Sequence, residues 1–459
     1  MATVAALTAT VTAKQHARNT LHRAVAASTV SRRSIMMAMA EDEDIPGLPD
    51  PMTLASMSSL KSTGSVSSSK VGSMSIITED GSSSSSVLLT LKNTGGSAAE
   101  LSGETGAAAV NAYLTYKGST SASSLRILRD LNNSGAQPYP TLPTTSRTSA
   151  QFGYTCAPDY AAGLVSNLAM DCAYSKWDVQ DAMGYATTAA SVALSCPSNV
   201  CEEGVYLAAY GDASPMSNSV YCSDVSGISR NTVAAFRERE YYGAAAGDAV
   251  VVATGVQDHK EFVAAVAAAF GDASSSNVSG SDAAVYEYRG GESRVVVEGR
   301  GKTYLRLAFA APACALVGDI LVATLQAQGV AAFCADGVLG VMGDADAAAV
   351  SQLVEDLVVA LGAPVTAETA ALGKLLAKAS ALIALEGTDT ISMAQSMTTG
   401  AVLGTEAYTP QDVAAAYDDI AVETVVAEAA KMKESVLSVS AVGGLAAVPY
   451  HPTLAAMLK

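Results

Sequence analysis

Two kinds of hydrophobic pattern alternate along the chain from residue 71 onward. Alternating or short continuous apolar runs predict strands, whereas apolar residues spaced three or four positions apart predict amphipathic helices. The predicted strands cover 71–78, 86–91, two runs within 137–156, 249–255 with its turn, 293–298, 304–310, 330–334, 338–342 and 436–442. The predicted helices cover 106–116, 121–131, 160–172, 177–194, 229–239, 259–270, 314–328, 347–361, 367–385 and 390–403.

The order of these elements repeats. Each half begins with strands, continues with helices and ends in a strand, which predicts a duplicated α+β unit. A segment rich in Ser, Gly and Asn separates the halves. The predicted organisation is a basic leader (1–40), a linker or extended arm (41–70), a first domain (71–270), a linker (271–291), a second domain (292–445) and a C-terminal tail (446–459).

Composition narrows the class of protein. Of the 459 residues, 49% are hydrophobic but only 5% are aromatic, and much of the apolar share is alanine. Alanine favours helices but buries little area, so we expect many thin, closely packed helices. The net charge of −17 argues against a nucleic-acid surface. The longest apolar stretch, 308–325, contains Asp319, so no membrane-spanning helix is expected and any membrane contact would be peripheral.

The first forty residues contain no Asp or Glu. They carry five arginines and lysines among Ser, Thr and Ala, and the acids begin at Glu41. This composition is typical of an organellar transit peptide, and the spacing of the arginines favours a mitochondrion over a plastid. A disordered basic tail is the alternative.

The seven cysteines indicate no disulfide framework. Their number is odd, and no pair has Cys-x-x-Cys spacing; Cys196 and Cys201 are nearest, with four residues between them. We expect reduced, buried thiols rather than a disulfide or zinc framework.

Several strings, in their order, resemble the mitochondrial processing peptidase family, which includes the core proteins of the cytochrome bc complex. The stretch 250–262 (VVVATGVQDHKEF) resembles the strand that closes that family's first domain, with one extra residue before His259. The stretch 288–294 (YRGGESR) resembles the opening of its second domain. The stretches 332–340 (AFCADGVLG) and 399–408 (TGAVLGTEAY) resemble its hairpin and its late helix. The resemblance covers about residues 70–445 and is closest to the core protein 2 branch.

The resemblance implies two homologous α/β-sandwich domains of the pitrilysin-like type that form a bowl. It also implies a scaffold subunit of respiratory complex III, peripheral on the matrix side of the inner membrane. The expected partners are a related core protein 1, cytochrome b, cytochrome c1 and the Rieske subunit, in a complex that is itself dimeric. No cofactor, metal or nucleic acid is expected.

The zinc motif of that family is missing. Active members carry His-x-x-Glu-His on a helix, where two imidazoles hold zinc and the glutamate activates water. The corresponding stretch is 106–118 (GAAAVNAYLTYKG), in which Ala109 and Tyr113 stand at the ligand positions and Ala112 at the base position. Outside the leader the chain has only His259 and His451, and neither lies in a ligand motif. We therefore expect an inactive homologue without catalytic residues, and a structural role for His259 at a turn or helix start.

Two glycine-containing segments carry no recognisable chemistry. The segment 299–303 (GRGKT) ends like a phosphate-binding loop, but Val296 stands where the first glycine belongs and a strand follows instead of a helix. A hairpin turn is the preferred interpretation. The segment 337–340 (GVLG) lacks the dinucleotide-binding pattern.

Two alternatives to the scaffold stay open. The first is an alpha-type, non-catalytic subunit of the processing peptidase that binds presequences. That subunit carries a glycine-rich loop where this chain has only 326–329 (QAQG), which favours the scaffold. The second is an unrelated mitochondrial Ala-rich enzyme, which no constellation of residues supports.

Cleavage of the leader is the first prediction. On protein isolated from mitochondria, N-terminal sequencing should place the mature end between about Ser31 and Asp50, where the acid-free segment has ended. An intact Met1 on that material would contradict the targeting signal.

Overall fold

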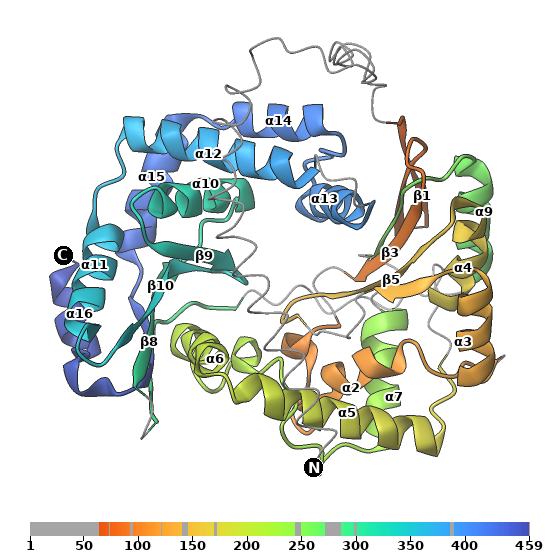
Figure 1. Cartoon of the computed structure of the whole chain (residues 1–459), viewed down its shortest axis with the longest axis horizontal. Coiled ribbons are helices and arrows are strands. Elements are labelled where there is room, and N and C mark those ends of the chain that lie inside the picture. Colours follow the sequence, from red (N-terminus) through yellow and green to blue (C-terminus); the bar gives the residue numbers. More distant parts are fainter. Residues whose placement is uncertain are drawn as a thin grey trace, which may run out of the picture. The chain divides into compact units, whose positions relative to one another are not determined.

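The computed structural model describes residues 64–458, apart from 73, 92–94, 121, 140–145, 169–171, 244–248, 271–285, 298–300 and 386–389 (Figure 1). The leader, the arm as far as residue 63 and most of the linker between the halves therefore lie outside the described residues.

The first half is built on a six-stranded mixed sheet. Its strands are β1 (Val66–Val71), β2 (Met74–Glu79), β3 (Ser85–Leu91), β4 (Gln137–Tyr139), β5 (Ala150–Cys156) and β6 (Ala249–Ala253). They lie in the order β1-β2-β6-β3-β5-β4. Strand β6, the last in sequence, inserts between β2 and β3; it runs parallel to β2 and antiparallel to β3.

The second half repeats this topology with five strands. They are β7 (Gly291–Val296), β8 (Lys302–Ala310), β9 (Ala331–Ala335), β10 (Val338–Asp346) and β11 (Ser438–Gly443), in the order β7-β11-β8-β10-β9. Strand β11 again inserts between two earlier strands, parallel to β7 and antiparallel to β8. The expectation of two α/β units with the same architecture is confirmed.

Fourteen α-helices accompany these sheets in the described residues. In the first half they are α2 (Ala107–Leu114), α3 (Ser124–Asn133), α4 (Ala161–Leu168), α5 (Lys176–Leu194), α6 (Pro197–Tyr210), α7 (Arg230–Arg237) and α9 (His259–Phe270). In the second half they are α10 (Ala315–Gln326), α11 (Val350–Gly362), α12 (Ala367–Leu385), α13 (Thr390–Leu403), α14 (Pro410–Asp418), α15 (Val422–Glu434) and α16 (His451–Met457).

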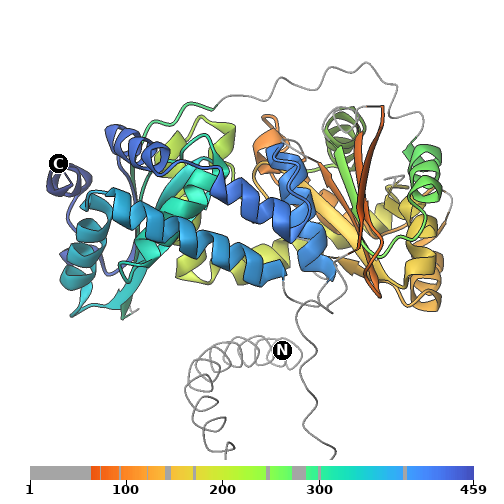
Figure 2. The same ribbon diagram turned by 90° about the horizontal axis from the view of Figure 1, so that it is seen from above.

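Both faces of the first sheet are apolar. Because side chains alternate along a strand, Leu89 and Val251 point to the face covered by α4 and α9, whereas Leu88 and Val252 point to the other face. Helix α13 covers that other face with Ala394 and Met397, although it comes from the second half of the chain. In Figure 2 the sheet is seen nearly edge-on, with α9 (green) on one side and α13 (blue) on the other.

The second sheet is also covered by helices from both halves of the chain. Leu307 and Val439 pack against the second half's own helices, among them α10, α11 and α15. The opposite face lies against α6, which comes from the first half of the chain (Figure 1). Gly204 of α6 permits this close approach, because a Cβ there would lie 2.4 Å from the Ser440 Oγ of β11.

Ion pairs fix α6 between the halves. The Arg147 guanidinium, only 2% exposed, lies 2.6 Å from the Glu203 carboxylate and 4.0 Å from the centre of the Tyr206 ring. The neighbouring Glu202 lies 2.9 Å from the Arg306 guanidinium of β8. Consecutive glutamates of one helix therefore bind one arginine from each half.

Local sequence signals explain several boundaries. Ser229 caps α7 and Thr409 caps α14, each as part of a capping box. Asp336 and Gly337 both have positive φ and join β9 to β10 in a two-residue hairpin, as Asp-Gly commonly does.

Three expectations from the sequence differ from the structure. The arm was expected to reach residue 70, but β1 begins at Val66 and pairs with β2. The segment 299–303 is not a hairpin turn, because β11 lies between the two strands that it joins. The expected tail contains α16, and its Leu454 side chain is fully buried. Just before α16, the Arg294 guanidinium donates hydrogen bonds to the carbonyl oxygens of Val448 and Pro449.

The cysteines match the expectation only in part. No disulfide joins any of the seven, but only Cys156, Cys201 and Cys222 are buried. Among the described residues, no single helix is long and apolar enough to cross a membrane. Helices α11 and α12 pass that test only as a pair, and they are bent by 102° at their junction.

Two matched glycine substitutions test the packing of α6. Gly184→Ala on α5 places a methyl group in open space and should raise the free energy of unfolding by about 0.5–1 kcal/mol, since alanine is the better helix former. Gly204→Ala should instead lower it by about 1–3 kcal/mol, because the methyl group collides with Ser440. Urea denaturation measures both, and Ser440→Gly in the Gly204→Ala background should recover part of the loss. Equal gains from the two single substitutions would contradict close packing of α6 on β11.

Candidate functional site

Helix α2 carries the positions where the resemblance places the lost zinc motif. Its N-cap, Gly106, has a φ of +89°, and a Cβ there would lie 2.1 Å from the Cys222 Sγ. The buried Glu100 carboxylate accepts hydrogen bonds from the backbone N–H groups of Gly106 and Ala108, both at 2.9 Å. An acidic side chain thus satisfies donors at the positive end of the helix dipole.

Burial raises the pKa of Glu100 to about 7, in spite of these two hydrogen bonds. The carboxyl group therefore changes charge near neutral pH while it is buried beside α2. This ionisation was not foreseen, because burial of residue 100 depends on how the preceding loop folds back onto the helix.

Two of the three positions, Ala109 and Tyr113, pack against neighbouring helices. Ala109 is buried among residues of α2, α5 and α7, in a cluster with Val179, Ala182 and Val233. The Tyr113 ring stacks on Tyr185 of α5, with the ring centres 6.2 Å apart and the planes 23° apart. Burial raises the pKa of Tyr113, which keeps the phenol neutral and a poor metal ligand. With the alanine methyl groups of Ala109 and Ala112, this set of side chains does not fit a zinc ion.

The two histidines outside the leader lie far from α2 in sequence and contact other elements. His259 begins α9; its Nδ1 lies 2.7 Å from the Thr78 Oγ1 and its Nε2 lies 3.0 Å from the Ser69 Oγ. It thereby ties α9 to β1 and β2, in line with the structural role expected of it. The His451 Nε2 lies 2.8 Å from the Leu437 carbonyl oxygen. Within the described part of the chain, no three His, Cys, Asp or Glu side chains are placed to hold a metal ion.

Two cavities flank α13, and Gln395, Thr399 and Leu403 line both of them. One cavity, of about 390 Å³, lies between α13 and the first sheet, where its walls include Thr90 and Gln151. The described residues that line it are uncharged.

The other cavity, of about 340 Å³, lies among α10, α12, α13 and α14. Asp319 of α10 and Tyr417 of α14 meet in its wall, and the Tyr417 hydroxyl donates a hydrogen bond of 3.1 Å to the Asp319 Oδ2. One signal for this site is visible in the sequence, where Asp319 interrupts an otherwise apolar stretch. Its partner Tyr417 lies on α14, which is absent from the elements predicted from the sequence.

Comparisons with known proteins support the fold. No family model and no curated protein sequence matches the chain. Its fold matches 191 chains of solved structures. One of these belongs to complex III2 from Candida albicans with Inz-5 bound, and it matches with a TM-score of 0.68 at 13% identity. The match covers 85% of this chain and 99% of that chain, so the two share one fold along nearly all of the solved chain.

The ionisation of Glu100 makes stability depend on pH. Its pKa is raised in the folded protein, so its stabilising contribution is complete below about pH 4.5 and is lost as the pH rises to about 7. The free energy of unfolding should fall by up to about 3 kcal/mol across this window from this group alone. Urea denaturation at a series of pH values, compared between the wild type and Glu100→Gln, measures it. The variant should be less stable than wild type near pH 5, and the difference should close or reverse near pH 8.

Glu355→Gln is the matched control, since Glu355 is exposed in the middle of α11. It should keep the wild-type pH profile. A Glu100→Gln profile parallel to the wild type throughout would show that Glu100 does not titrate in this window.

Proposed function

We propose that this chain is a non-catalytic core subunit of mitochondrial ubiquinol–cytochrome c reductase, respiratory complex III, of the core protein 2 kind. The observation that carries the proposal is the fold shared with nearly the whole of a chain from complex III2. The order of the family-like strings along the sequence supports the same assignment. In this role the chain pairs with a related core protein and supports assembly with cytochrome b, cytochrome c1 and the Rieske subunit.

The chemistry of α2 supports a role other than peptide hydrolysis. Hydrolysis by this fold needs two ligands and a base on one helix face, and here those positions hold two methyl groups and a stacked tyrosine. Because these positions carry packing side chains in place of ligands, the fold is suited to a structural role, in which its surfaces contact other subunits.

Helix α12 presents one such surface. Leu375 and Ile383 are 66% and 67% exposed, and Leu372 and Leu376 extend the same apolar face. Both lysines of this helix turn toward the α14–α15 junction, where Lys374 donates to the Asp418 and Ile420 carbonyls and Lys378 pairs with the Asp418 carboxylate. A partner subunit that covers this face would remove exposed apolar area from water, as in obligate assemblies.

The alternative, an alpha-type peptidase subunit, shares the fold and the absence of zinc ligands. It needs a presequence-binding, glycine-rich loop after the first helix of the second domain. Here α10 ends at Gln326 and β9 begins at Ala331, which leaves a short turn with one glycine, Gly329. This favours the scaffold, placed peripherally on the matrix side of the inner membrane.

Fractionation of mitochondria tests this function. The chain should sediment with inner membranes, resist extraction by salt alone, and migrate after mild detergent with cytochrome b, cytochrome c1 and the Rieske subunit on a native gel. The isolated chain should also unfold at a lower temperature than the chain within the complex, since binding partners stabilise only the folded state.

A soluble matrix enzyme, followed through the same fractions, is the control for incomplete lysis. Recovery of the chain as a soluble heterodimer with an active zinc peptidase would instead support the alternative. A thermally robust, soluble monomer would overturn both.

A further inference from the structure

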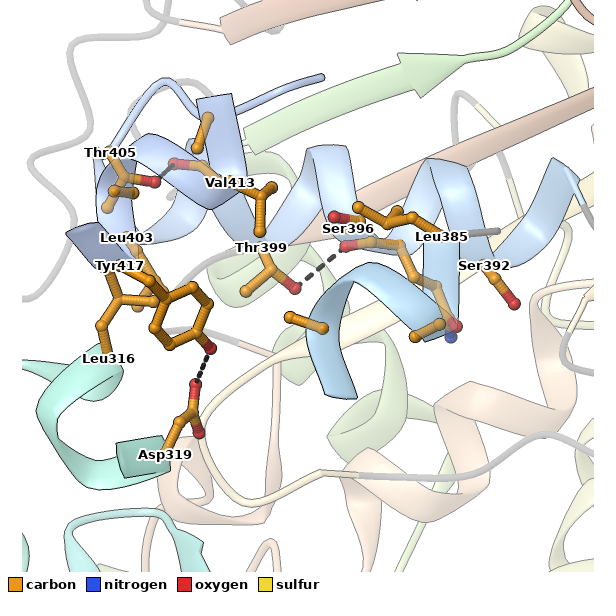
Figure 3. A pocket seen from close by; sticks show the side chains of 16 residues that line it. Leu316, Asp319, Leu385, Ser392, Ser396, Thr399, Leu403, Thr405, Val413 and Tyr417 are labelled. Carbon is orange, nitrogen blue, oxygen red and sulfur yellow. Dashed lines mark hydrogen bonds between the residues drawn. The ribbon is translucent and has the colours of Figure 1, made fainter. Parts of the chain in front are cut away.

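The cavity among α10, α12, α13 and α14 is not used by the proposed function. Half of the residues that line it are aliphatic, with Leu316, Leu385, Leu403 and Val413 among them (Figure 3). Its volume of about 340 Å³ lies at the lower end of the range of about 300–1,000 Å³ that is usual for small-molecule sites. Such sites combine apolar walls with polar groups that orient the ligand.

One carboxylate dominates the electrostatics of this cavity. Asp319 is the only charged residue among the described residues that line it. Its Oδ2 accepts the Tyr417 hydroxyl, whereas its Oδ1 makes no hydrogen bond to any other part of the described chain. Figure 3 shows this pair at one end of the cavity, with Thr399 and Ser396 toward its middle.

Among the residues that the structure describes, no cation pairs with this carboxylate. The lysines of the adjacent α12 interact with other groups. Lys378 forms an ion pair with the Asp418 carboxylate, and Lys374 donates hydrogen bonds to two backbone carbonyl oxygens. Consistently, burial raises the pKa of Asp319, and the Tyr417 hydrogen bond offsets only part of that rise. The Cys334 thiol nearby has a raised pKa as well, partly because of the Asp319 charge. An amine cation beside Oδ1 would supply the missing opposite charge.

The remaining polar groups of the cavity are hydroxyls and one amide. The Thr399 hydroxyl donates to the Gln395 carbonyl oxygen, and the Thr405 hydroxyl to the Gly400 carbonyl oxygen. The Gln395 amide nitrogen is engaged with the Tyr139 hydroxyl. The Thr399, Thr405 and Gln395 donors are therefore engaged within the protein, and the Asp319 charge repels a carboxylate or phosphate in the cavity.

We propose that this cavity binds a small amphipathic amine, with its ammonium group on the Asp319 carboxylate and its apolar body against the aliphatic walls. Asp319 supplies the preference for a cation, and the walls supply most of the affinity by burying apolar surface. The opposite face of α13 covers the first sheet, so an occupant of the cavity also supports the helix that joins the two halves. The proposal does not depend on membership of complex III.

Three probes with the same body and different ends test it. Octylamine, octanol and octanoate are titrated into the purified full-length protein by calorimetry. Octylamine should bind at least tenfold more tightly than octanol, and octanoate should bind more weakly than both. Equal affinity for the three probes, or no binding of octylamine, would overturn the proposal without any mutation.

Substitutions then locate the site. Asp319→Asn should reduce the affinity for octylamine to that for octanol and leave octanol binding unchanged. Ala416→Leu, which fills part of the cavity, should weaken the binding of octylamine and octanol alike. Asp356→Asn is the matched control, since Asp356 is an exposed aspartate of α11 that does not line the cavity, and it should bind as wild type does. An unchanged preference for the amine in folded Asp319→Asn would place the binding elsewhere.

Discussion

Each of the two sheets is buried on both faces, and a sheet buried on both faces needs a cover on both sides. The helices nearest in sequence cover only one face of each sheet. The second face of the first sheet is covered by α13, and the second face of the second sheet by α6. Each half therefore supplies the helix that completes the core of the other. Neither half has a complete core alone, because separation would expose Leu88 and Val252 in one half and the Ser440 side of β11 in the other.

Helix α6 meets several constraints at once. It begins at Pro197, which suits a first helical turn, and Gly204 lets its backbone approach β11. Its two central glutamates pair with Arg147 and Arg306, and its last residue, Tyr210, donates a hydrogen bond of 2.7 Å to the Asp336 carbonyl oxygen in the β9–β10 hairpin. The Arg147–Glu203 pair is nearly buried, so removing either partner would leave a buried charge without its counter-charge. This placement explains why a helix of modest hydrophobicity lies in the middle of the molecule.

The region around α2 is stabilised by a buried carboxylate at the start of the helix and by packing along it. Glu100 satisfies its first N–H groups, Ala109 fills the space toward α5 and α7, and Tyr113 stacks on Tyr185. Every one of these contacts increases packing and none supplies a ligand. The polar chemistry that the structure does bring together lies elsewhere, at Asp319 and Tyr417 beside α13, where a carboxylate faces an aliphatic cavity.

The sequence alone determined the strands, most of the helices and the repeated order of the two halves, because periodicity and turn chemistry are local properties. It also indicated that Ala109 and Ala112 supply no zinc ligand, since a methyl group has no donor atom. Helices α14 and α15 could have been found from the Thr409–Asp412 capping box and from the lysines in the last turn of α15. Only the tertiary structure decided that β6 and β11 insert between earlier strands. It also decided that α6 covers the sheet of the second half and α13 the sheet of the first half, and that Asp319 contacts Tyr417. These features depend on contacts between residues about a hundred to several hundred positions apart, which periodicity along one segment cannot encode.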